Sequence, residues 1–382
     1  MANDVILVVN AGSSSVKAAL FGAGEAPLAA FSVTEVGAGA VLRTAGGERP
    51  CAAPDHEAAI GLILDAAAAG GVPVARLAGA GHRIVHGGRA LTRPVILDEG
   101  AIAAIEACVP VAPLHNPHNL AAIRALGRRA PSLPQVGVFD TAFHATNPEV
   151  ALRYAIPAAE EAKGIRRYGF HGISFASLVE RLPAMLGGPL PGRLLACHLG
   201  NGVSLCAIRS GRSAATTMGY SPLEGTTMGT RSGGIDGNAV LRLASDHGVE
   251  AAGRILNRES GLLALGGASD MRALHAAGTA EARFAIDHFC YWAVRHAGSM
   301  IAAMGGLDCI AFTGGIGEND AVVRARICAG LSFLGVAVDA AANVRNAGRI
   351  EAGGSLPVLV VPAGEEAWIA AATRRLISGR GR

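Results

Sequence analysis

The chain has 382 residues, enough for two or three domains, and its 51% hydrophobic against 16% charged residues indicate buried cores and exclude global disorder. Lys+Arg 33 against Asp+Glu 30 leaves a net charge of +3, too balanced for a protein that binds mainly nucleic acid or an anionic membrane. No apolar stretch approaches the roughly 18 residues of a membrane-spanning helix, and the N-terminus lacks the marks of a signal peptide. We therefore expect a soluble, cytoplasmic protein.

Two residue types are used unevenly. The seven cysteines form no C-x-x-C pair, which argues against a disulfide framework or a zinc site and predicts small buried side chains. The only lysines are Lys17 and Lys163, so arginine supplies nearly all of the positive charge. A lysine is normally a solvated surface residue, but the scarcity of lysine makes Lys17 a candidate functional residue.

In the first half, apolar runs bounded by glycine, proline and polar residues alternate with segments of helical spacing. Strands are predicted at 5–10, 16–21, 77–85 and 135–140, and helices at 56–69, 98–108 and 117–129. Residues 24–55 predict further edge strands, without a clear pattern.

The second half has the same alternation. Strands are predicted at 193–198, 203–208, 308–313 and 356–361, and helices at 173–186, 237–247, 279–304, 319–330 and 365–377. Alternating strands and helices indicate an α/β protein whose sheets are covered on their faces.

Each half begins with a strand, a glycine turn and a returning strand. Placing Asn10 on His198 places Gly12 on Gly200, an offset of 188 residues. Glycine turns between strands are common, so this motif alone is weak support for an internal duplication.

Three glycine turns follow predicted strands, at 11–15, 199–202 and 314–317. Glycine lets backbone N–H groups converge on a bound oxygen, which favours anion binding. None of the turns fits the P-loop pattern or the dinucleotide-binding fingerprint. Three such turns, one of them with three serines and Lys17, predict a site for a nucleotide polyphosphate, where the lysine would act as a point charge.

Histidine and arginine recur among small residues in four loop-like segments, at 81–88, 113–117, 168–172 and 228–234. A single such histidine is more often a structural hydrogen-bonding residue than a catalyst. Together with Asp140 at the end of a strand, however, these segments supply the guanidinium, imidazole and carboxylate groups that phosphoryl transfer needs. A metal here would be Mg²⁺ held by hard oxygens, for which Asp140, Glu365 and Glu366 qualify by their chemistry.

These segments resemble the acetate kinases of the acetate/propionate/butyrate kinase family. The first of them reads Asn-Ala-Gly-Ser-Ser-Ser-Val-Lys, and the last reads Thr-Gly-Gly-Ile-Gly-Glu-Asn. The matching segments lie in the family's order and are Asn10–Lys17, Gly81–Gly88, Ala112–Pro117, Val138–His144, Arg167–Gly172, His198–Gly202, Met218–Gly225, Met228–Gly233, Ser269–Arg272 and Thr313–Asn319.

The resemblance implies an α/β protein of the two-domain actin-like ATPase and sugar kinase superfold. This superfold has duplicated ribonuclease H-like domains, with the active site in the cleft between them. The expected N-terminal acetate kinase domain is 1–145 plus 367–382, and the expected nucleotide-binding domain is 146–366. The resemblance also implies a homodimer and no nucleic-acid or membrane partner.

The resemblance also assigns the site. The implied catalytic residues are Asp140, Arg83, His171 and Arg231. The implied substrate-binding residues are Arg83, which holds the carboxylate, with Val85, Leu114, His115, Phe170 and Pro222. The implied nucleotide- and phosphate-binding residues are Ser13, Ser15, Lys17, His198, Leu199, Gly200, Asn201, Gly202, Asp270, Met271, Arg272, Gly314, Gly315, Ile316, Gly317 and Glu318. Asn10 and Glu365 would hold Mg²⁺, with Mn²⁺ as the alternative.

The implied reaction is reversible in-line transfer of the ATP γ-phosphoryl group to acetate. Val85 is bulky where propionate-preferring relatives tend to carry alanine, which favours acetate. A propionate or butyrate kinase is the nearest alternative, and a non-metabolic actin-like ATPase switch or an inactive paralogue are the others. The chain departs from the family pattern at Phe175, Ala215, Gly234, Gly237 and Gly364, which bears on the rate but removes no residue assigned to the chemical step.

Overall fold

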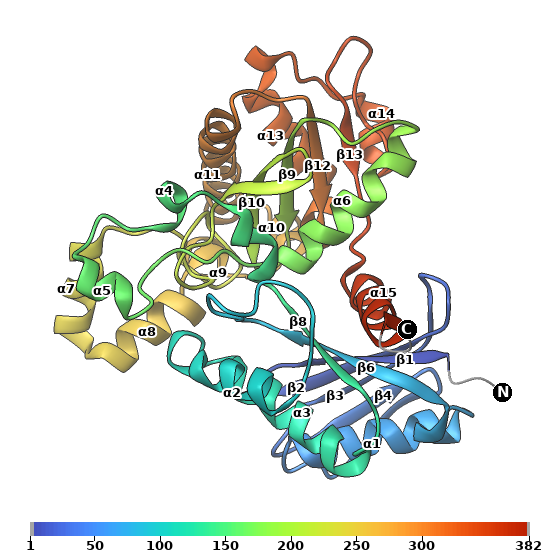
Figure 1. Cartoon of the computed structure of the whole chain (residues 1–382). Coiled ribbons are helices and arrows are strands. Elements are labelled where there is room, and N and C mark those ends of the chain that lie inside the picture. The colour runs from blue at the N-terminus through green and yellow to red at the C-terminus, as the bar shows by residue number, and fades with distance from the viewer. Residues whose placement is uncertain (1–3, 380–382) are drawn as a thin grey trace. The chain divides into compact units, whose positions relative to one another are not determined.

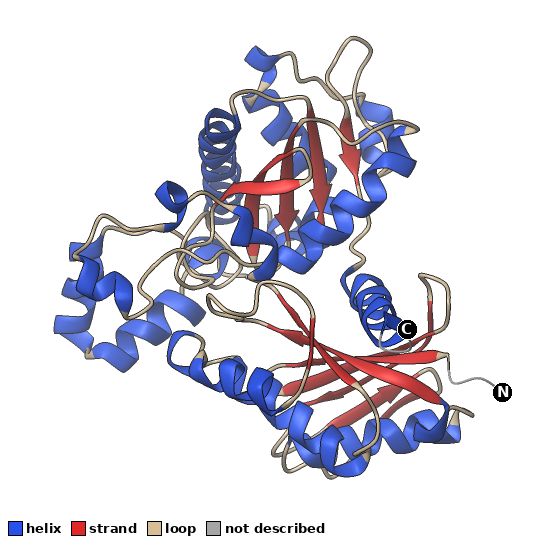
Figure 2. Cartoon of the chain, viewed as in Figure 1, coloured by secondary structure: helices blue, strands red, loops and turns tan. Residues whose placement is uncertain are grey.

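The computed structural model describes residues 4–379, which form two compact units (Figure 1). Unit 1 holds the residues up to Phe143 together with those from Gly364 onward, and unit 2 is His144–Ala363. Each unit is built on one β-sheet with helices packed against it (Figure 2), so the predicted α/β class is confirmed. Among the described residues, no helix has both the length and the apolar character needed to cross a membrane.

The sheet of unit 1 has eight strands in the order β5-β4-β3-β2-β1-β6-β8-β7. Strand β1 pairs antiparallel with β2 and parallel with β6, and β6 pairs parallel with β8. The strands are β1 (Val5–Ala11), β2 (Ser15–Phe21), β3 (Pro27–Thr34), β4 (Val41–Thr44), β5 (Gly47–Pro50), β6 (Leu77–Ile84), β7 (Val95–Ile96) and β8 (Gln135–Phe139).

The sheet of unit 2 repeats this topology. Its order is β11-β10-β9-β12-β13, with the same strand directions as β3-β2-β1-β6-β8. The strands are β9 (Arg193–Leu199), β10 (Val203–Arg209), β11 (Arg212–Thr216), β12 (Cys309–Thr313) and β13 (Val358–Val360).

Strands β1 and β9, and likewise β2 and β10, begin 188 residues apart, so the predicted duplication is confirmed. The two hairpins differ in register: Asn10 pairs with Lys17, whereas His198 pairs with Ser204, which makes the turn of unit 2 one residue shorter.

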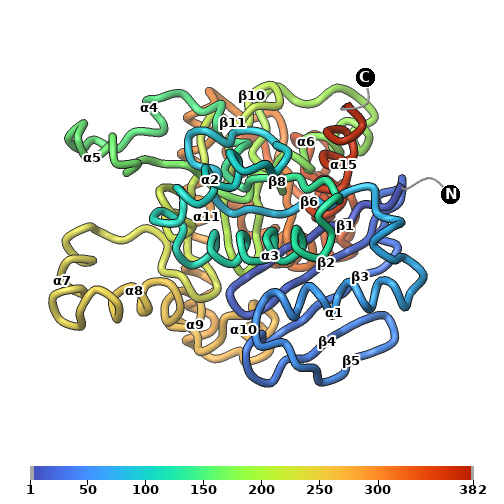
Figure 3. Tube along the Cα trace, turned by 60° about the horizontal axis from the view of Figure 1, so that its bottom comes forward, coloured from blue at the N-terminus to red at the C-terminus, as the bar shows by residue number. Residues whose placement is uncertain are grey.

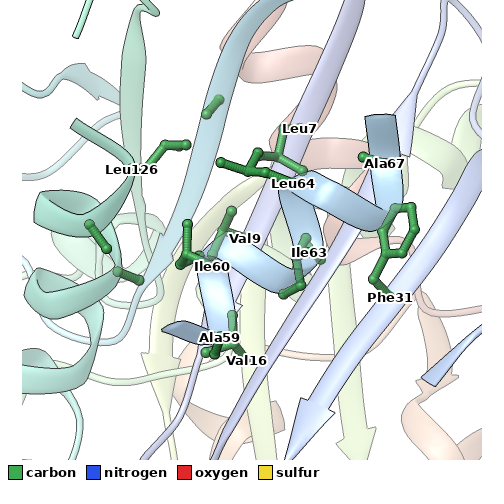
Figure 4. Packing of buried hydrophobic residues seen from close by; sticks show 14 of the residues in the cluster. Leu7, Val9, Val16, Phe31, Ala59, Ile60, Ile63, Leu64, Ala67 and Leu126 are labelled. Carbon is green, nitrogen blue, oxygen red and sulfur yellow. The ribbon is translucent and has the colours of Figure 1, made fainter. Parts of the chain in front are cut away.

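The core of unit 1 lies between the sheet and two helices. Helix α1 (His56–Ala69) packs on β2 and β3, and α3 (Asn116–Arg129) packs beside it on β1 and β6 (Figure 3). Asp55 caps α1 by accepting the Ala58 N–H at 2.8 Å. Ile60 and Ile63 of α1 meet Val9 and Val16 of the sheet (Figure 4), as the apolar face of an amphipathic helix should.

Helices α2 (Glu99–Ala107) and α15 (Glu365–Ser378) complete unit 1. Helix α15 packs on β1, β6 and β8, on the side of the sheet away from α1 and α3 (Figure 2). The approach is close at Gly81, where an added Cβ would lie 2.6 Å from Ile369 Cγ2. A glycine is therefore required there for α15 to pack.

Unit 2 is richer in helices. The longest is α11, whose 25 residues pack on β9, β10 and β11 and which ends at Gly305, a residue with a φ of 76°. The helices are α4 (Glu149–Leu152), α5 (Ala158–Ala162), α6 (Gly172–Leu186), α7 (Gly237–His247), α8 (Val249–Arg258), α9 (Gly261–Gly266), α10 (Met271–Ala277), α11 (Ala280–Met304), α12 (Gly314–Asn319), α13 (Ala321–Gly330) and α14 (Ala340–Val344). Across both units, short 3₁₀ turns occur at Val74–Arg76, Val109–Val111, Ala142–Thr146 and Ser332–Leu334.

One sequence prediction was wrong in kind. Residues 314–317 were expected to form a glycine turn, but they begin the short helix α12. Gly314 enters this helix at a φ of 80°, and the Glu318 carboxylate accepts its N–H at 3.1 Å. The helix expected over 319–330 starts instead at Ala321, because Asp320 caps α13 by accepting the N–H groups of Val322 and Val323.

Candidate active site

In unit 1, Arg83 near the end of β6 meets Asp140 directly after β8. These strands are parallel neighbours, so their carboxyl ends lie at one edge of the sheet. Arg83 donates to Asp140 Oδ2 from Nη2 at 2.8 Å and from Nε at 3.1 Å. The Asp140 side chain is only 3% exposed and that of Arg83 is 23% exposed. Burial disfavours the charged guanidinium, but the nearby carboxylates of Asp140, Glu365 and Glu366 outweigh it and raise the pKa of Arg83.

Two buried asparagines that the sequence analysis missed hold this edge together. Asn119 accepts the Val85 N–H at 3.1 Å and donates to the Ala11 carbonyl at 2.8 Å. Asn116 accepts the His86 N–H at 3.2 Å and donates to the His86 carbonyl at 3.0 Å. The two lie three residues apart on the first turn of α3, hence on one helix face. Asn116 belongs to the Ala112–Pro117 motif, and Asn119, two residues beyond it, was the available signal.

The serine turn follows β1 at the same edge. It closes through the Gly12 N–H, which donates to the Ser15 carbonyl at 2.8 Å. Ser13 is exposed and Ser15 is half-buried. His56, the first residue of α1, donates from Nε2 to the Gly12 carbonyl at 2.7 Å. His56 was not predicted as a support for this turn, since it lies 44 residues from Gly12 in the sequence.

Asn10 and Lys17 are cross-strand partners at the end of the β1–β2 hairpin, so their side chains share one face of the sheet. Glu365 is the first residue of α15, which packs against β1, and its carboxylate raises the pKa of Arg83. An amide oxygen and a carboxylate are hard donors that suit Mg²⁺, which keeps waters and substrate oxygens as its other ligands. Within residues 4–379, no group of three or more His, Cys, Asp or Glu is placed to hold a metal ion.

The residues expected around the acyl group belong to both units. In unit 1, Val85 and His115 are half-buried and Leu114 is 48% exposed. In unit 2, Phe170 is 2% exposed and Pro222 is half-buried.

In unit 2, two histidines stack against each other. His171 has a φ of 57° at the start of α6, and its ring lies 4.0 Å from that of His198 with an interplanar angle of 24°. His171 Nδ1 shares a hydrogen bond with the Ser204 hydroxyl at 2.9 Å, and His198 Nδ1 shares one with Ser174 at 2.8 Å. These bonds fix the orientation of both rings.

Arg231 joins His171 at the turn after β9. A Cβ added at Gly202 would lie 3.2 Å from His171 Nε2 and 3.4 Å from Arg231 Nη1, so both groups converge on this glycine. Arg231 also donates to the Pro222 carbonyl at 3.3 Å. No carboxylate of the described residues pairs with its guanidinium, and burial lowers its pKa. A half-buried cation without an anion is suited to a bound anion.

The segment before His171 is tied to the loop that carries Pro222. The Tyr154 hydroxyl donates to the Glu224 carboxylate, and the Arg167 guanidinium lies 4.2 Å from the centre of the Tyr154 ring. The Tyr168 N–H donates to the Gly219 carbonyl at 3.0 Å. These contacts join the segment that precedes His171 to the loop on which Arg231 donates to Pro222. None of them was predicted from the sequence.

A cavity of about 750 Å³ opens beside these groups in unit 2. It brings together three stretches that the sequence assigned to the nucleotide, around 200, 270 and 315. Its lining residues are Gly200, Asn201, Ser269, Asp270, Met271, Arg272, His275, Gly315, Ile316, Asn319, Asp320, Ala321 and Val322. Leu199 has a fully buried side chain, which leaves only its backbone for contact with a ligand.

Polar contacts hold α12, which contributes to the lining of this cavity, in place. Glu318, expected near the nucleotide, accepts the backbone N–H groups of Gly314 and Ala363 at 3.1 and 3.0 Å. Arg324 on α13 is fully buried and donates to the Gly317 carbonyl at 2.9 Å. It also donates to the Asn343 carbonyl at 2.7 Å and to the Asn346 side chain at 2.6 Å. The sequence analysis missed Arg324, because a single arginine on a helix carries no signal of burial.

Arg324→Met should destabilise the protein strongly, because it leaves several buried acceptors without donors, at about 1–3 kcal/mol for each. We expect a loss of about 3 kcal/mol and a fall in Tm of about 6–12 °C, measured by thermal unfolding. Arg326→Ala is the matched control, since Arg326 sits on the same helix in an exposed pair with Asp287 and should change Tm little. Equal Tm values for the two variants would contradict the role given to Arg324.

The residues that depart from the family pattern occupy structural positions. Phe175 is fully buried in α6, and its ring meets that of His144 edge-on at 5.8 Å. Ala215 pairs with Ala207 in the sheet, and Gly234 donates its N–H to the Gly225 carbonyl at 2.8 Å. Gly237 and Gly364 stand at the starts of α7 and α15.

The sequence matches the profile of the Acetokinase family over residues 5–371. It is 44% identical to the acetate kinase of Nitrobacter hamburgensis, across 99% of this chain and 97% of that protein. It is 43% identical to the acetate kinase of Deinococcus deserti, across 98% of each.

Two solved structures are similar over almost their whole length. The acetate kinase of Porphyromonas gingivalis superposes with a TM-score of 0.91 at 35% identity, covering 98% of this chain and 99% of that one. A propionate kinase from Francisella tularensis superposes with a TM-score of 0.91 at 34% identity, covering 98% of this chain and 100% of that one.

Proposed function

Because the chain belongs to the acetokinase family, we propose that it transfers the γ-phosphoryl group of ATP to acetate, giving acetyl phosphate and ADP, and that it catalyses the reverse reaction too. The observation that carries this proposal is the half-buried, unpaired guanidinium of Arg231 beside His171 and Gly202, next to a cavity of nucleotide size.

Unit 2 would bind the nucleotide. The backbone of residues 199–202 would hold phosphate oxygens, and the stretches around 270 and 315 would enclose the nucleoside. Arg231 and His171 would then neutralise the charge that spreads over the equatorial oxygens of the phosphoryl group in the transition state. Both groups are already oriented by neighbours, so little reorganisation is needed during the reaction.

Unit 1 would bind the acceptor. Arg83 would hold the acetate carboxylate through its planar fork, with the charge balanced by Asp140 beneath it. An acetate oxygen forms the new bond to the γ-phosphorus as the bond to the bridging oxygen of ADP breaks. Ser13, Ser15 and Lys17 would contact the transferred group, and Asp140 would polarise or deprotonate the attacking carboxyl.

Asn10 and Glu365 would hold Mg²⁺, with Mn²⁺ as the alternative, and the bound metal would neutralise phosphate charge. We further propose that the chain acts as a homodimer in the cytoplasm. Light scattering of the purified protein tests the oligomeric state.

The test of the function is a hydroxamate assay for acyl phosphate with ATP, Mg²⁺ and acetate, propionate or butyrate. We expect product with acetate, less with propionate and least with butyrate. ATP hydrolysis without acyl phosphate would favour a conformational switch, and no turnover with any acid would indicate an inactive paralogue.

The acceptor preference should depend on Val85. Val85→Ala enlarges the acyl site, and one methylene is worth about 1–3 kcal/mol, so kcat/KM for propionate relative to acetate should rise by roughly tenfold. Val95→Ala, at another half-buried valine of unit 1, is the control and should leave the ratio unchanged. An unchanged ratio in Val85→Ala would mean that the acyl group binds elsewhere.

A further inference from the structure

We propose that His275 selects adenine over guanine nucleotides, with Asp320 fixing the tautomer that makes this selection. The inference rests on the proposed function in one respect, namely that the cavity of unit 2 takes a nucleotide. Neither residue belongs to the motifs on which the sequence analysis depended.

Both residues line the cavity, from different helices. His275 lies on α10, and Asp320 lies between α12 and α13. His275 Nε2 is 2.8 Å from Asp320 Oδ2, and the two side chains are 34% and 12% exposed. Asp320 is itself immobilised, because its Oδ1 accepts the N–H groups of Val322 and Val323 at 3.0 Å each. One carboxylate oxygen therefore caps α13 while the other holds the imidazole.

This geometry determines which nitrogen of His275 carries the proton. An ionised carboxylate can only accept, so Nε2 of the neutral ring is the donor and Nδ1 is left as an acceptor. Among residues 4–379, Nδ1 of His275 has no hydrogen-bond partner. His275, which lines the cavity, thus offers Nδ1 as a hydrogen-bond acceptor.

The position of His275 and Asp320 in the cavity indicates that they would contact the base of the nucleotide. The phosphates would lie at the glycine turn around Gly200, whereas Ile316, Ala321 and Val322 supply an apolar wall suited to a flat ring. His275 and Asp320 belong to this apolar side, since Asp320 directly precedes Ala321. A purine bound there would present its six-position substituent to polar groups of the wall.

The two purines differ at that substituent in hydrogen-bonding sense. Adenine carries an amino group, which donates, and guanine carries a carbonyl, which accepts. As an acceptor, Nδ1 can take a hydrogen bond from the amino group of adenine. With guanine, the lone pair of Nδ1 would face a lone pair of the carbonyl oxygen, and the two would repel each other. A site that leaves such polar groups unpaired discriminates strongly, so we expect roughly 10–100-fold preference for the adenine nucleotide.

Asp320→Asn gives the sharpest test. The helix cap requires an acceptor, so the amide oxygen should keep capping α13 and the amide nitrogen should face His275. That nitrogen donates to Nε2, which moves the ring proton to Nδ1 and turns it into a donor. The preference should then shift toward guanine nucleotides beyond the level of His275→Ala, which removes the group altogether.

The measurement is the dissociation constant of ADP and of GDP by calorimetry, without acetate, for the full chain. We expect the wild type to prefer ADP, His275→Ala to bind both within about threefold, and Asp320→Asn to lower the ADP/GDP ratio further. His247→Ala, at an exposed histidine on α7, is the matched control and should keep the wild-type ratio.

If His275→Ala kept the wild-type ratio of ADP to GDP affinity, His275 would not select the base. If Asp320→Asn kept that ratio, Asp320 would not set the tautomer of His275. Thermal unfolding shows whether Asp320→Asn keeps its helix cap, and His275→Ala leaves that cap untouched. Because binding is measured without turnover, loss of acetyl phosphate synthesis would refute the proposed function alone.

Discussion

Arg231→Ala is expected to lower kcat by about 10³-fold while changing KM for ATP by less than about threefold. The guanidinium lies at Gly202 beside His171 and has no carboxylate partner among the described residues, so its charge is available to a substrate anion. The phosphoryl group becomes planar, with its charge spread over three equatorial oxygens, only as it transfers. Steady-state kinetics with varied ATP and acetate separate the effect on kcat from that on KM.

Two variants make the Arg231 result specific. Arg231→Lys keeps the charge but loses the planar fork, so its kcat should fall between those of alanine and wild type. Arg254→Ala removes an exposed arginine of the same unit, paired with Glu259, and should leave the kinetics unchanged. If Arg231→Ala raised KM for ATP as much as it lowered kcat, the side chain would act in ground-state binding and the transition-state role would fail.

Arg83→Ala should affect both acetate binding and stability. Loss of the carboxylate clamp should raise KM for acetate by about 10²-fold, since charge-assisted bonds to a carboxylate contribute about 1.5–3 kcal/mol. The same change removes the guanidinium that pairs with the Asp140 carboxylate, which is 3% exposed. A buried charge without its partner costs about 3–5 kcal/mol, and the partial exposure of Arg83 places our expectation near the lower end.

The double variant Arg83→Ala/Asp140→Ala separates the two effects. Removing both charges should restore much of the lost stability, because the buried carboxylate is removed together with the guanidinium, but it should restore no activity. Urea unfolding gives the stabilities, and the hydroxamate assay gives the activities. Wild-type KM for acetate in Arg83→Ala would exclude Arg83 as the carboxylate clamp, and equal stability of the single and double variants would contradict the pairing energy.

The strand–turn–strand hairpins could be predicted closely because their signals are local. Apolar runs ended by glycine and serine turns gave β1, β2, β9 and β10 to within a residue, and the offset of 188 residues held in the folded chain. Helix α12 could not be predicted in this way, since its glycine-rich sequence also suits a turn. Its start depends on the Glu318 carboxylate, which bonds both Gly314 and Ala363, a residue 45 positions away.

The candidate site likewise combines residues that local sequence patterns predict with supporting residues that they do not. Local motifs predicted these residues: Arg83, His171 and Arg231 lie in short segments with glycine nearby, and Asp140 ends a predicted strand. Their supports were not recognisable: Asn119 bonds Ala11 across 108 residues, and Tyr154 bonds Glu224 across 70. Local backbone preferences act within a few residues and leave a pattern in the sequence. Pairings between distant polar groups form only when the packed sheets bring them together, and the side chains that make them carry no local mark of that partner.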